Sequence, residues 1–279
     1  MALMASYPSI VPFLNIVPPP GYRLHQVLPL DRLAQQIRGE SAILDIRRDV
    51  LLGGEVVDRR DETLILQNGV WANPGAGAYE LDPIEGSDWL GGQSLGFVET
   101  RIAIRNGVFS WRREPGSYVV FSGAGRKTFL SDNSPKFSHP AVIQQIAAYG
   151  KWAEGYPACV VDPDRDADQS VVLINPYERP AVVTLEFEGL ELTHRVRVDA
   201  LTAKRIAFSK ILDPVARCWS GQAFVSGSNR IVMFFVSHSM KNAANINTME
   251  HSDPYRGASD WYPFTRALHF KFRTRNGLR

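Results

Sequence analysis

One segment near the C-terminus gathers residue types that perform acid–base and metal chemistry. The apolar run 231–236 leads to His238, and a polar connection then leads to Glu250, His251 and Asp253. Imidazoles and carboxylates that leave a buried strand together can ligate a divalent metal or share a proton. We therefore predict His238 and His251 as ligands of a divalent metal, and all four residues as candidates for a catalytic site.

A structural interpretation of this segment stays open beside the chemical one. The two histidines are 13 positions apart, and this spacing fixes no geometry because successive side chains of a strand point to opposite faces. Asp253 precedes Pro254 and favours a turn, near which the histidines would only hydrogen-bond the backbone. Tyr255 and Trp261 follow, and these amphipathic aromatic residues are the candidates for ligand binding.

A second candidate for metal binding is an acidic run. Its carboxylates alternate along the chain at Asp162, Asp164, Asp166 and Asp168. Alternating oxygen ligands suit calcium, but Ala167 and Leu173 stand where a calcium-binding EF-hand loop needs glycine and a bidentate glutamate. We therefore interpret the run as a solvated linker.

The other motifs that could carry chemistry lack the required spacing. Two glycine-containing segments, 90–96 and 122–128, have neither the P-loop nor the dinucleotide-binding pattern. No G-x-S-x-G nucleophile elbow occurs. Cys159 and Cys218 have no second thiol at C-x-x-C spacing, so we predict buried free thiols.

Composition limits the class of protein. The chain has 279 residues, of which 44% are hydrophobic and 22% are charged, and both fractions are near globular averages. A net charge of +2 is too weak to indicate a nucleic-acid partner. No stretch approaches the roughly 20 apolar residues of a membrane span, and the apolar N-terminus lacks the basic region of a signal peptide. We predict a cytoplasmic protein that binds neither nucleic acid nor membrane.

The elements that must position these residues are mostly strands. Repeated prolines predict an extended arm over 1–21, and a short helix with Asp31 as its cap follows. Runs of β-branched and aromatic residues predict strands over 42–129 and again after 168. The pair Asn106-Gly107 is the strongest hairpin signal, and Asn68-Gly69 is a weaker one. The pattern of 139–152 predicts a second helix that buries Ile143 and Ile146.

These patterns predict a mainly β protein built from two antiparallel modules with one or two short helices. We place an N-terminal β-rich module over 22–160 and a C-terminal β-sandwich over 161–279. Regular turn spacing in the second module suggests an immunoglobulin-like sandwich, although the Cys…Trp…Cys hallmark is missing.

Two functional hypotheses remain. The first is a non-catalytic binding or assembly protein with a protein partner, a second copy of itself or a small-molecule ligand. The alternative is a metal-assisted or acid–base hydrolase or lyase with its site around His238 and His251. Fold alone does not separate them, because β-sandwiches host both classes.

Overall fold

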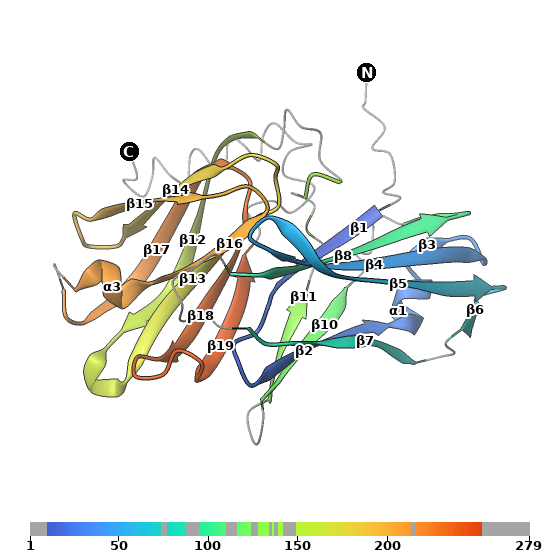
Figure 1. The fold of residues 1–279 in the computed structure, drawn as a ribbon, viewed down its shortest axis with the longest axis horizontal. Helices are drawn as coiled ribbons and strands as arrows, with labels where there is room; N and C mark the ends of the chain where they lie inside the picture. Colours follow the sequence, from blue (N-terminus) through green and yellow to red (C-terminus); the bar gives the residue numbers. More distant parts are fainter. Residues whose placement is uncertain are drawn as a thin grey trace.

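The structure is a computed structural model, and it describes residues 10–73, 77–87, 95–109, 116–123, 128–133, 136, 139–141, 149–213 and 216–252. As predicted, the protein is mainly β, with antiparallel sheets and only short helices in the described part. Figure 1 shows the N-terminal strands on the right and the C-terminal strands on the left. None of the helices in these residues is long and apolar enough to cross a membrane.

Two sheets face each other in the N-terminal half. The first has the order β1 (Ile10–Ile16), β8 (Phe97–Arg105), β4 (Ala42–Leu52), β5 (Glu55–Gln67) and β6 (Val70–Asn73). The second has the order β11 (Thr128–Asn133), β10 (Ser117–Gly123), β2 (Tyr22–Pro29) and β7 (Ala78–Glu85). A small sheet pairs β3 (Ile37–Arg38) with β9 (Val108–Phe109), and α1 (Leu30–Ala34) follows β2. Alternation of buried and more exposed residues along β2 and β4 directs one face of each strand into the core between the sheets.

Two further sheets form the C-terminal half. One has the order β12 (Tyr149–Val161), β17 (Trp219–Asn229), β14 (Ala181–Phe187) and β15 (Thr193–Val198). The other has the order β16 (Thr202–Ala207), β13 (Ala167–Asn175), β18 (Val232–Ser239) and β19 (Ile246–Ser252). The short helices η1 (Pro163–Arg165) and α3 (Phe208–Leu212) connect strands of different sheets. The immunoglobulin-like description is not confirmed, because β18 and β19 continue the sheet of β13 and do not pair with β17.

The sheet that contains β13 and β18 is buried on both faces. Val172 and Phe234 point into a cluster shared with the N-terminal half, while Leu173 and Phe235 point into the core of the C-terminal half. A strand that is buried on both faces has a continuous apolar sequence, and 231–236 is such a sequence. Backbone hydrogen bonds between Leu95 and Ala203 also join the halves. The two halves therefore share one core cluster in addition to their separate cores.

Two glycine-containing residue pairs form tight turns between paired strands. Asn68 and Gly69 have φ values of 49° and 76° and join the paired strands β5 and β6. Positive φ at both positions is the requirement of a type I′ hairpin turn, so this prediction is confirmed. The Gly53-Gly54 turn between β4 and β5 has the same signs, with φ values of 61° and 92°.

The prediction of a hairpin around Asn106-Gly107 is wrong, because the strand after this turn does not pair with the strand before it. Asn106 does have a positive φ of 57°, but β9 pairs with β3 and not with β8. The burial of Phe109 in the N-terminal core accompanies this change of partner. The residue pair determines where the chain turns, whereas packing of the next apolar side chain decides which strand it joins.

Three other predicted elements differ or lie outside the described residues. The arm predicted for 1–21 is extended from Ile10 onward, but it is a strand of a sheet, and six of the seven residues of β1 are buried. Pro12 is tolerated because β1 lies at a sheet edge. Asp31 lies in the first turn of α1 and does not cap it, because the N-cap residue is Pro29. Residues 142–148 of the second predicted helix, including both isoleucines, lie outside the described residues. Its last four residues, 149–152, are not helical, because they belong to strand β12.

The predicted boundary between modules, at 160 and 161, falls at the end of β12. Because β12 pairs with β17, its sheet belongs to the C-terminal half.

Candidate functional site

His238 lies inside the C-terminal half and is 1% exposed. Its Nδ1 donates a hydrogen bond to the Ser239 carbonyl at 2.9 Å. Its Nε2 accepts from the Ser170 hydroxyl at 2.6 Å and from the Arg205 guanidinium at 2.9 Å. Both ring nitrogens are thus occupied by protein groups. The prediction of His238 as a metal ligand is not supported, because a ligating imidazole needs one nitrogen free for the ion.

The strand register separates the other predicted ligands from His238. His251 lies opposite Phe234, four residues before His238 on β18, which corresponds to roughly 13 Å along a strand. The side chain of Glu250 is exposed. Asp253, Tyr255 and Trp261 lie outside the described residues. The described members of the predicted site therefore do not converge.

The environment of His238 predicts acid sensitivity. Burial lowers the pKa of His238 below its ordinary 6.5, and the nearby guanidinium of Arg205 lowers it further, although the Ser239 carbonyl opposes this. Above about pH 6.5 the imidazole is neutral in both the folded and the unfolded chain. Below that pH the unfolded chain binds the proton more readily, so we expect the stability to fall as the pH is lowered from about 6.5 towards the folded-state pKa.

Urea denaturation between pH 7.5 and 5 measures this effect. His238→Asn should lack this part of the pH dependence, whereas His194→Asn, on the edge strand β15, should retain it. Equal pH dependence in the wild type and His238→Asn would contradict the assignment.

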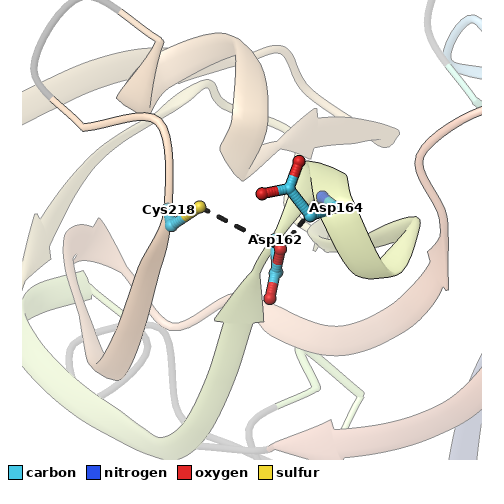
Figure 2. A group of neighbouring side chains, drawn as sticks. All are labelled: Asp162, Asp164 and Cys218. Atoms are coloured by element: carbon cyan, nitrogen blue, oxygen red, sulfur yellow. Dashed lines mark hydrogen bonds between the residues drawn. The ribbon is translucent and has the colours of Figure 1, made fainter.

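The acidic run forms a corner between β12 and β13. Asp162, Asp164 and Cys218 place possible ligand atoms within 4.8 Å of one another, and this is the only group of three or more such residues in the part of the chain described (Figure 2). Asp162 also accepts hydrogen bonds from two backbone amides of η1. Asp164 pairs with Arg217 at 2.9 Å. The carboxylates thus have structural partners that stabilise the turn. Both cysteines are free, but only Cys159 is buried as predicted, whereas Cys218 is exposed.

A cleft between the two halves holds a denser polar network. Its volume is about 430 Å³. Strands β4, β5 and β8 supply one wall, and segments 139–141, 176–178 and Leu201 supply the rest. The Gly53-Gly54 turn approaches the opposite half, since a Cβ on Gly54 would lie 3.4 Å from the Ala200 carbonyl oxygen. Clefts of this size at a junction of two modules are common ligand sites.

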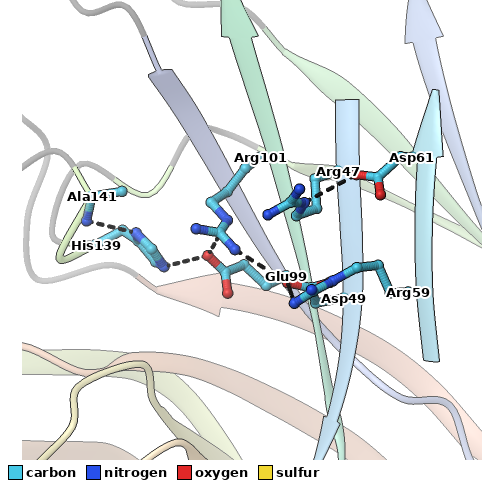
Figure 3. A network of polar contacts seen from close by, with 8 residues as sticks. All are labelled: Arg47, Asp49, Arg59, Asp61, Glu99, Arg101, His139 and Ala141. Atoms are coloured by element: carbon cyan, nitrogen blue, oxygen red, sulfur yellow. Dashed lines mark hydrogen bonds and ion pairs between the residues drawn. The ribbon is translucent and has the colours of Figure 1, made fainter. Parts of the chain in front are cut away.

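Asp49 lies at the centre of the charged wall and is 2% exposed. Arg59 binds it with two nitrogens, at 2.7 Å to Oδ1 and 3.3 Å to Oδ2. Arg101 Nη2 reaches the same Oδ2 at 3.1 Å (Figure 3). The pairing of β4 with β5 and β8 explains this geometry, because Arg59 is directly opposite Asp49 and Arg101 is on the adjacent strand. One buried carboxylate therefore holds two guanidinium groups side by side.

Glu99 extends the network to the segment that connects the two halves. Its Oε1 lies 2.9 Å from His139 Nε2 and 3.0 Å from Arg101 Nε. The Ala141 amide donates to His139 Nδ1 at 3.0 Å, so the imidazole carries its proton on Nε2 and donates it to Glu99. Burial alone would raise the pKa of Glu99, but the hydrogen bond from His139 and the positive charges beside the carboxylate outweigh burial and lower it. Glu99 is thus held as a carboxylate.

Sequence reasoning missed this site, although a partial signal exists. At every second position the charge changes sign in three short segments: from Asp45 through Arg47 to Asp49, from Arg59 to Asp61, and from Glu99 to Arg101. Opposite charges directly across neighbouring strands stabilise a sheet, so such alternation indicates strands that pair with one another. The register that places Asp49 between two arginines cannot be read from the individual segments.

No family model matches the chain, and no curated protein matches it significantly.

Proposed function

We propose that this chain is a non-catalytic binding protein and that it takes a small polar ligand in the cleft between its halves. The observation that carries the proposal is the placement of Asp49, Arg59 and Arg101 on the wall of this cleft. An ion-pair network on a rigid sheet offers fixed hydrogen-bonding groups, and such groups orient a ligand without further ordering cost.

The remaining lining supports the same function. Leu51, Val56, Pro140, Pro176 and Leu201 supply apolar surface beside the charged groups. Ligand pockets combine a largely apolar wall with a few placed polar groups. A cytoplasmic location and a protein partner or second copy remain predictions from the sequence.

A cleft-filling substitution tests the proposal. Val56→Trp places a large ring on the wall of the cleft, at a side chain that is 43% exposed. We expect members of a library of small polar metabolites to raise the Tm of the wild type by several degrees, because a ligand at 100 times its Kd adds about 2.7 kcal/mol of stability. These shifts should be lost in Val56→Trp.

Val182→Trp is the matched control, since Val182 is 50% exposed on β14 in the C-terminal half and does not line the cleft. It should preserve the shifts. A ligand that still raises the Tm of Val56→Trp binds outside the cleft. If every ligand found in the library behaves in this way, the proposed function is wrong.

A further inference from the structure

We propose that the cleft selects a zwitterion, an α-amino acid or dipeptide, with its carboxylate on Arg59 and Arg101 and its ammonium group beside Glu178. This inference rests on the proposed function, because it names the ligand class of the same cleft.

The two arginines provide the carboxylate end. Nη1 of Arg59 and Nη1 of Arg101 make no hydrogen bond within the described residues. Both side chains are partly exposed, at 48% and 34%, and both line the cleft. Because Asp49 holds them together through its Oδ2, their remaining donors are available to one oxyanion on the solvent side. Paired guanidinium donors suit a carboxylate through charge-assisted hydrogen bonds.

Glu178 provides the ammonium end. It lines the cleft from the C-terminal half, and its side chain is exposed. No hydrogen bond or ion pair to Glu178 exists among the residues that the structure describes. An unpaired carboxylate across the cleft from guanidinium donors is complementary to a ligand that carries both charges.

The charge of the wall argues against a ligand of large net charge. Asp49 and Glu99 balance the positive charges of Arg59 and Arg101. The wall thus offers oriented donors without a large excess of positive charge. A ligand that is neutral overall fits this wall and Glu178 together. The cleft volume of about 430 Å³ admits a molecule of dipeptide size.

Three related dipeptides test the contact of the ligand's carboxylate and the contact of its ammonium group separately. Isothermal titration with alanyl-alanine, N-acetyl-alanyl-alanine and alanyl-alaninamide compares a zwitterion with an anion and a cation of similar size. We expect the free dipeptide to bind most tightly and each blocked form to bind at least about tenfold more weakly, because each loses a charge-assisted contact.

Two variants assign each preference to a residue. In Glu178→Gln, the free and N-acetylated dipeptides should bind alike, because the partner of the ammonium group is gone. In Arg59→Met, the preference for the free dipeptide over its amide should shrink, because only Arg101 is left to bind the carboxylate. A purely structural effect would weaken all three probes equally. The controls Glu191→Gln and Arg195→Met change exposed residues that do not line the cleft and should keep the full preference for the free dipeptide.

The outcomes distinguish this inference from the proposed function. Equal affinity for the three probes, or no binding of any of them at millimolar concentration, overturns the zwitterion assignment. The proposed binding function of the cleft still holds in that case if the Tm shifts caused by library ligands are lost in Val56→Trp. Both proposals fail if dipeptide binding and library binding are unchanged in Val56→Trp.

Discussion

Truncation of Phe235 to alanine is expected to lower the free energy of unfolding by about 3–5 kcal/mol, the usual cost of removing a buried aromatic side chain. Phe235 is 1% exposed and stacks on Tyr156 with ring centroids 4.2 Å apart. Its neighbour Phe234 is 2% exposed on the opposite face and packs in the cluster that both halves share. Phe234→Ala is expected to cost a similar amount.

Urea denaturation followed by circular dichroism and by tryptophan fluorescence measures both variants. Because Phe234 joins the two halves, we expect one transition with the same midpoint by both probes. Val182→Ala, at an exposed position of β14, should change the stability by less than about 0.5 kcal/mol. Unchanged stability in Phe234→Ala would show that the shared cluster contributes little, and two transitions with different midpoints would show that the halves unfold independently.

Replacement of Arg48 by methionine is expected to raise the free energy of unfolding by about 1–4 kcal/mol, as hydrophobic replacements of buried charged groups have done elsewhere. Arg48 is 1% exposed, and its Nε, Nη1 and Nη2 find no hydrogen-bond partner in the described part of the chain. Burial lowers its pKa, which reflects the cost of removing the charge from water. Methionine keeps much of the side-chain length without that cost.

The adjacent Arg47 provides a matched control on the other face of β4. It is half exposed and pairs with Asp61 at 3.0 Å. Arg47→Met should change the stability by no more than about 1 kcal/mol, since exposed ion pairs contribute little. A loss of stability in Arg48→Met larger than that in Arg47→Met would instead show that the buried guanidinium makes a stabilising contact.

The surroundings of Arg48 suggest why a charge is found in this core. Thr100 lies opposite Arg48 on β8 and donates to Gln26, which in turn bonds Ser117. Apolar clusters lie on both sides of this polar layer. Polar groups buried in this way can specify the alignment of two sheets at some expense of stability.

The sequence by itself determined the class of the fold and several of its local features. Period-two patterns and β-branched runs depend on neighbours in the chain, so the strands and their burial alternation were predictable. The positive φ values at Asn68 and Gly69 follow from residue type. The apolar run 231–236 indicated a buried strand for the same reason, and the structure shows that it is buried on both faces.

The tertiary structure decided which chemical groups meet. Asp49, Glu99 and His139 are distant in sequence, and only the register of β4 with β8 and the return of the connecting segment bring them to one cleft. His238 and His251 are closer in sequence, yet the register of β18 with β19 keeps them apart. A slip of one residue would turn every side chain of a strand to its other face, and register is set by burial across whole sheets. The site therefore depends on long-range packing, which no short segment of the sequence encodes.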